Sequence, residues 1–187
     1  MTREIVRALM SSFVKEPKEI NPIGERKAFI GTYIENINDV SPVDLSKRFI
    51  VVEPYEHVGF RPQDKKGVTA SENIAWIIHQ ITNAETYIIP AWKVGVKDKA
   101  SFAAAARGSL GTIFEGGDAV VHKPATFTAE FKRSDATRLL IEMMLAGSPF
   151  LSICLSHQLT AHAHVKLIIG LWIKARRRLF FPVEGCF

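Results

Sequence analysis

The residue of this sequence with the clearest chemical potential is Cys154, which ends an apolar segment and precedes a stretch that can form a helix. Small residues, Ser152 and Ser156, lie two positions before and two positions after it. A nucleophile in a tight strand-to-helix turn needs small neighbours at these positions, because the flanking segments approach each other closely. The helix dipole and unpaired N–H groups at a helix N-terminus also favour the thiolate. This pattern predicts a cysteine nucleophile, with the backbone N–H of Leu155 as an oxyanion donor.

The residues around Cys154 also carry a family resemblance. The segment Ser152-Ile153-Cys154-Leu155-Ser156-His157-Gln158 resembles the nucleophile motif of class I glutamine amidotransferases, which typically reads Gly-Ile-Cys-Leu-Gly-His-Gln. The resemblance covers about residues 47–173. It implies that Cys154 attacks the side-chain amide of glutamine and releases ammonia, and that water hydrolyses the glutamyl thioester to glutamate. It further implies that Gln158 helps to shape the glutamine pocket, and that a synthase domain or partner subunit receives the ammonia.

The sequence departs from the family pattern in two respects. Both motif glycines are serines, and the catalytic His and Glu that the family carries downstream of the cysteine are not recognisable, since no histidine follows His164. Two alternatives to an active glutaminase therefore stay open. One is an inactive binding or regulatory module with the same fold. The other is a cysteine hydrolase of related architecture whose base comes from elsewhere, such as His57 or His122, because a cysteine nucleophile normally needs a base.

Strands that alternate with helices must position these residues. The apolar, β-branched runs predict four strands and the periodic segments predict four helices. The expected strands are 49–53, 86–90, 119–121 and 149–153, and the expected helices are 71–82, 100–107, 134–145 and 155–173. This alternation indicates an α/β domain with a mainly parallel sheet flanked by helices, of the flavodoxin-like or class I glutamine amidotransferase-like kind. We expect the fold to be incomplete at its C-terminal end.

The expected strand ends indicate where chemistry takes place. Ligands of such sheets bind beyond the carboxyl ends of the strands. Loops beginning at Glu53, Pro90, His122 and Cys154 should therefore share one edge of the sheet.

Turn and cap signals define the expected helix ends. Glu72 lies three residues after Thr69, as a capping box requires, so Thr69 or Ser71 should begin the first helix of the domain. Ser134 is expected to cap the helix that ends before Gly147. Upstream, residues 2–14 have one apolar face and predict a short helix, and residues 28–34 are read as a short strand or an irregular arm.

Length and charge set the domain organisation. The 187 residues suffice for one domain, which we divide into an N-terminal arm (1–46), the α/β domain (47–173) and a basic tail (174–187). The tail carries four positive charges within five residues, and the whole chain has a net charge of +5. The basic excess therefore belongs mainly to the tail and does not indicate a nucleic-acid partner.

The remaining composition limits cofactors, compartment and partners. Two cysteines cannot build a disulfide scaffold, which favours the cytoplasm. No apolar run reaches the roughly 18 residues that a membrane span needs. His157, His162 and His164 do not share one helix face, and we expect no metal and no cofactor. An incomplete sheet would expose an edge and an apolar helix face, which predicts association of copies into a homo-oligomer.

Overall fold

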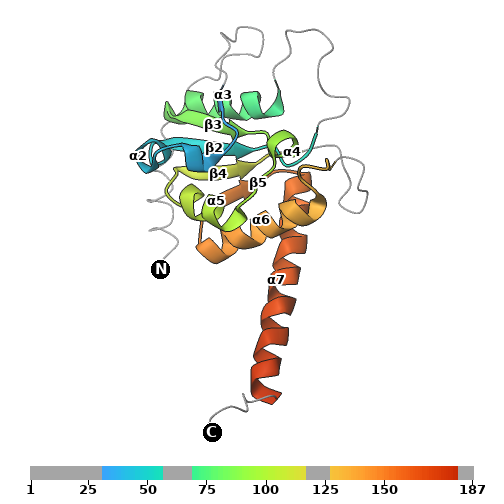
Figure 1. Ribbon diagram of the computed structural model, residues 1–187. Coiled ribbons are helices and arrows are strands. Elements are labelled where there is room, and N and C mark those ends of the chain that lie inside the picture. Colours follow the sequence, from blue (N-terminus) through green and yellow to red (C-terminus); the bar gives the residue numbers. More distant parts are fainter. Residues whose placement is uncertain (1–30, 57–68, 117–126, 181–187) are drawn as a thin grey trace, which may run out of the picture.

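A computed structural model of the chain describes residues 31–56, 69–116 and 127–180, with side chains described up to residue 174. Its centre is a five-stranded sheet in which every neighbouring pair of strands is parallel, in the order β1-β3-β2-β4-β5 (Figure 1). The strands are β1 (Thr32–Tyr33), β2 (Arg48–Val52), β3 (Glu85–Ile89), β4 (Gly111–Phe114) and β5 (Phe150–Ser152). The helices are η2 (Ile37–Asp39), α2 (Pro42–Leu45), α3 (Ala70–Thr82), α4 (Ala91–Val94), α5 (Lys99–Ala106), α6 (Arg133–Ala146) and α7 (Leu155–Phe180).

The strand order is consistent with a flavodoxin-like fold. In the sheet, β2 lies between β3 on one side and β4 and then β5 on the other. When β2 is counted as the first strand, this order is 2-1-3-4, as in the flavodoxin-like fold. The short strand β1 adds to β3 at one edge, and β5 forms the other edge. The predicted α/β class with a parallel sheet is therefore confirmed.

Two apolar clusters cover the two faces of this sheet. Alternate residues of a strand point to opposite faces, so Ile50 and Val52 of β2 join the cluster made by α5 and α6, whereas Val51 joins the cluster made by α3. The α5–α6 side is the larger core and includes the fully buried Leu139 and Met143. The helices thus lie on both faces, as right-handed crossovers between parallel strands require.

The predicted start of α3 is confirmed. The Thr69 hydroxyl accepts a hydrogen bond from the Glu72 N–H, and the Glu72 carboxylate accepts one from the Thr69 N–H. At α6 the predicted cap is wrong. The residue at the N-cap is Lys132, whose N–H donates to the Asp135 carboxylate, so Ser134 lies inside the first turn. Gly147 ends α6 with a left-handed φ of 64°, as the sequence predicts.

The third strand of the domain lies earlier than predicted. β4 occupies Gly111–Phe114 and pairs with β2 and β5, and the expected strand at 119–121 lies outside the described residues. The loop at the carboxyl end of this strand therefore starts at Glu115 and not at His122. The expected loops at Glu53, Pro90 and Cys154 do start at carboxyl ends of strands.

Residues 31–46 lie within the packed body. β1 pairs with β3, and Ile37 and Leu45 are buried in the core. These residues were expected in an N-terminal arm, but they supply an edge strand and core side chains. The expected helix at 2–14 lies outside the described residues.

The last helix is longer than predicted and leaves the body. α7 was expected to end at residue 173 and runs to Phe180. Figure 1 shows its second half projecting away from the sheet and from α6. In the part of the chain that the structure describes, no helix is long and apolar enough to cross a membrane.

Candidate active site at the end of β5

Cys154 lies between the end of β5 and the first residue of α7, and its side chain is exposed. Its φ is 50°, in the left-handed region that residues other than glycine rarely adopt. The carbonyl oxygen of Cys154 accepts hydrogen bonds from the N–H groups of His157 (3.0 Å) and Gln158 (3.4 Å), so Cys154 begins the helix. This is the strand-to-helix turn that a nucleophile elbow requires.

The loop after β4 passes directly beside the cysteine. A Cβ atom added to Gly116 would lie 2.7 Å from the Cys154 Cβ and 3.3 Å from the Ile153 carbonyl oxygen. Only glycine fits this contact without a shift of the backbone. The sequence analysis missed Gly116 because it placed the strand at 119–121. The Gly-Gly pair at 116–117, which the sequence does show, was the available signal.

The two other predicted site residues lie on the first turn of α7. The side chain of Leu155 is fully buried, which fixes its N–H at the helix start, among groups that have no acceptor within the helix. Gln158 is exposed, and its N–H bond to the Cys154 carbonyl places it one turn along from the cysteine. The structure thus brings Cys154, Leu155 and Gln158 together at the carboxyl edge of the sheet.

Two buried hydroxyl groups, those of Tyr55 and Ser156, bind the loop after β4 next to the start of α7. Ser156 is fully buried, and its hydroxyl lies at donor distance (2.6 Å) from the carbonyl oxygen of Glu115. The Tyr55 hydroxyl donates to the same oxygen at 2.8 Å and contacts the Ser156 hydroxyl. Burial raises the pKa of Tyr55 above its ordinary value. These contacts join the ends of β2 and β4 to the helix that carries the cysteine.

Two acidic side chains are buried at the same edge of the sheet. Glu53, after β2, is 6% exposed, and its carboxylate accepts a hydrogen bond from the indole N–H of Trp92 at 2.9 Å. Glu115, after β4, is fully buried, and its carboxylate accepts one from the Ser71 hydroxyl at 2.5 Å. Buried carboxylates need such partners. The sequence placed Glu53 at the start of a loop on this edge of the sheet, whereas no local pattern marks Glu115.

Three histidines lie on α7, the helix that follows Cys154. His157 and His164 are exposed on α7, and His162 is partly exposed. Burial and the positive charges of Lys166 and Arg133 lower the pKa of His162. Among the residues that the structure describes, no group of three or more His, Cys, Asp or Glu side chains can hold a metal ion. His57 and His122, the alternative bases, lie outside the described ranges.

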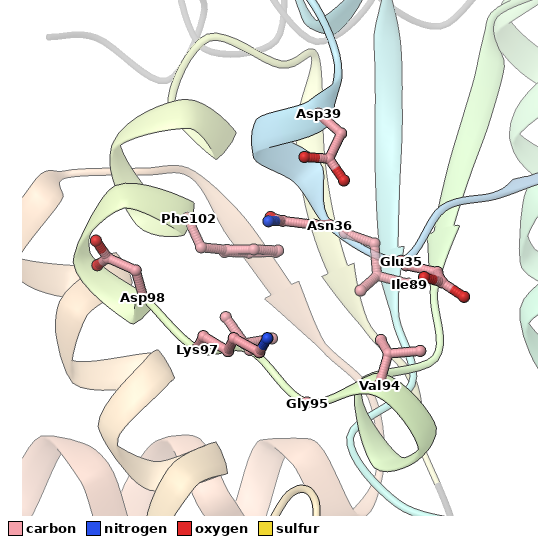
Figure 2. A pocket seen from close by; sticks show the side chains of 10 residues that line it. Glu35, Asn36, Asp39, Ile89, Val94, Gly95, Lys97, Asp98 and Phe102 are labelled. Carbon is pink, nitrogen blue, oxygen red and sulfur yellow. The ribbon is translucent and has the colours of Figure 1, made fainter.

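A cavity of about 240 Å³ lies away from Cys154, next to Ile89 at the carboxyl end of β3. Figure 2 shows it between η2 and the segment that joins α4 to α5, with Glu35, Asp39, Lys97 and Phe102 around it. It does not include Cys154, Leu155 or Gln158. Its volume is below the roughly 300 Å³ at which ligand pockets usually begin.

Comparison of the chain with protein-family models, with curated proteins and with solved structures finds no match. The geometry around Cys154 is therefore the basis for a functional interpretation.

Proposed function

We propose that the protein is a glutamine amidotransferase-like cysteine hydrolase that releases ammonia from glutamine through a thioester on Cys154. The observation that carries the proposal is the left-handed conformation of this exposed cysteine at the strand-to-helix turn, with φ of 50°. A non-glycine residue in this region costs about 1–3 kcal/mol, and such strain is concentrated at functional sites. A core cysteine would be buried, and it would have no need of this conformation.

The residues around Cys154 suit an acyl-transfer reaction. The Sγ atom would attack the side-chain carbonyl carbon of glutamine, and the C–N bond would break when the leaving amine takes a proton and departs as ammonia. Water would then attack the thioester, so that glutamate is released and the thiol is restored. The N–H of Leu155 belongs to the first residue of α7, at the positive end of the helix, where an oxyanion would be stabilised.

The loop after β4 supplies a second argument for the oxyanion site. The resemblance implies that glycines after the third strand often form the other half of the oxyanion hole in this family, and the loop expected at His122 has no glycine at 122–125. With β4 at Gly111–Phe114, Gly116 follows the strand after one residue and lies against Cys154. The backbone of two segments, the loop after β4 and the turn between β5 and α7, would therefore lie next to a substrate bound at Cys154. The base that takes the thiol proton is assigned to a histidine outside the described residues, His57 or His122.

A glutaminase assay with two matched cysteine variants tests this proposal. Ammonia release from glutamine by the full chain should be abolished in Cys154→Ala and unchanged in Cys186→Ala, since only the first residue lies at the elbow. A glutamine-analogue diazo-ketone should add one covalent label, located at Cys154 by peptide mass spectrometry. Ammonia release that survives Cys154→Ala would contradict the proposal. Absence of both ammonia release and labelling would favour the inactive binding or regulatory module.

A further inference from the structure

The second half of α7 presents an apolar surface that the described part of the body does not cover. Ala163 is the last buried residue of the helix, and every described residue after it is exposed or partly exposed. Six large apolar side chains in this part are 43–58% exposed. They are Val165, Ile168, Ile169, Leu171, Trp172 and Ile173. Because α7 projects clear of the sheet and of α6, another helix can lie alongside it (Figure 1).

These side chains form one stripe and not a random scatter. Val165, Ile168, Ile169 and Trp172 follow the i, i+3, i+4, i+7 spacing of a single helix face. Leu171 and Ile173 extend the stripe on either side. The row that packs against the body earlier in the helix is a different one, Leu155, Leu159 and Ala163 at i, i+4, i+8. The exposed stripe is therefore a second apolar face of α7, which we call the α7 stripe (residues 165–173).

We propose that the α7 stripe binds the same stripe of a second copy of this chain, so that two α7 helices pack antiparallel. The exposed fractions of the six side chains amount to roughly 600 Å² in each copy, or about 1,200 Å² for a pair, which is the lower limit of specific protein–protein interfaces. A stripe of this spacing matches a copy of itself, as a two-fold symmetric interface requires. This inference is independent of the chemistry at Cys154.

Charge decides the direction of the two helices. The residues directly after the stripe include Lys174, Arg176, Arg177 and Arg178, and a parallel pair would bring eight such cations together. In an antiparallel pair centred on the stripe, the two basic clusters lie about 20 Å apart at the 1.5 Å rise of a helix. This distance exceeds the screening length of about 8 Å at physiological salt. Lys174 lies on the opposite side of the helix from the stripe, and Lys166 lies at the edge of the stripe beside Ile173; both side chains are exposed.

The mass of the protein in solution tests the interface. Sedimentation equilibrium at tens of micromolar should give twice the 20.9 kDa of one chain. Trp172→Glu and Ile169→Glu should each weaken self-association at least about tenfold, because each buries a charge within the apolar contact. Ile81→Glu, a matched change at an apolar residue of α3 that is 70% exposed, should leave the dimer intact. Far-UV circular dichroism should show that all three variants stay folded.

Disulfide trapping tests the direction, in a background without Cys154 and Cys186. The face formed by Val165, Ile168, Ile169 and Trp172 is centred between Ile168 and Ile169, so Ile169→Cys should crosslink with itself. Val165→Cys and Trp172→Cys should each fail alone and crosslink when mixed. Self-crosslinking at all three positions would overturn the antiparallel arrangement. A monomeric wild-type chain would overturn the interface, and so would an α7 variant as dimeric as wild type. Cosedimentation of the wild-type monomer with phosphatidylcholine–phosphatidylserine vesicles would instead assign the stripe to a lipid surface.

Discussion

At the scale of single residues, the site depends on a cysteine held in a strained turn by its neighbours. The buried side chain of Leu155 fixes the start of α7, and the Ser156 hydroxyl bonds to the Glu115 carbonyl at 2.6 Å. These contacts offset the cost of the left-handed conformation at Cys154. The turn itself could be predicted from the small residues around the cysteine. The role of Ser156 could not, because its partner Tyr55 is 101 residues away in sequence.

The contact between Gly116 and Cys154 gives a residue-scale prediction. Gly116→Ala places a Cβ 2.7 Å from the Cys154 Cβ, so one of the two backbone segments must move. We expect a loss of about 1–3 kcal/mol in the free energy of unfolding. The alkylation of the Cys154 thiol by iodoacetamide should slow about tenfold, measured in a Cys186→Ser background, because the thiol leaves the helix N-terminus. Gly170→Ala is the matched control, since no atom lies within 4 Å of the added Cβ. An unchanged alkylation rate in Gly116→Ala would show that Gly116 does not help to position the Cys154 thiol.

At the scale of elements, long helices with capping signals could be predicted and short strands could not. Thr69 and Glu72 define the start of α3 through bonds between neighbours in sequence, which a sequence displays directly. The four residues of β4 become a strand through register, with Ile113 beside Val51 of β2 on one side and Leu151 of β5 on the other. Nothing local distinguishes them from the more apolar segment at 119–121. The error in β4 then hid the glycine beside the cysteine.

The start of α6 gives an element-scale prediction with a pH dependence. Burial alone would raise the pKa of Asp135, but hydrogen bonds from the Lys99 ammonium and the Lys132 N–H hold it below its usual value. The ammonium lies 2.9 Å from the carboxylate. A carboxyl whose pKa is lower in the folded state adds stability above its unfolded-state pKa, near 4, and loses it as the pH falls through the folded-state value.

Asp135→Asn should therefore destabilise the protein at neutral pH and not in acid. Asparagine can still accept the Lys132 N–H, so the substitution removes mainly the charge. For a carboxylate one third exposed, we expect a loss of about 0.5–1 kcal/mol at pH 7. The difference from wild type should shrink below pH 4, as measured by urea unfolding. Glu142→Gln, which weakens an exposed pair with Arg138 on the same helix, should change stability less. A constant difference between pH 7 and pH 3 would rule out the charge as the cause.

At the scale of the whole molecule, the protein has a packed body from which the second half of α7 projects (Figure 1). The body ends where Leu155, Leu159 and Ala163 pack onto the core. The sequence correctly indicated the parallel sheet, because apolar β-branched runs alternate with periodic helices. It could not indicate that α7 has a second apolar face that is exposed. The spacing of apolar residues shows which of them share a helix face, but it does not show whether that face is buried. The function of that stripe is separable from the stability of the body.

Truncation of the chain tests this separation. A chain that ends after Leu167 keeps every buried residue of α7 and should fold, with a Tm within a few degrees of the monomeric Trp172→Glu variant. That variant is the proper reference, because the proposed dimer would itself raise the Tm of the full chain. A chain that ends after Ser152 loses all three buried apolar side chains of α7, of which each leucine is worth about 1.5–3 kcal/mol and the alanine about 0.8 kcal/mol, and should not fold. Circular dichroism melting of the three chains distinguishes the outcomes. A chain ending after Leu167 that fails to fold would show that the projecting half of α7 also stabilises the body.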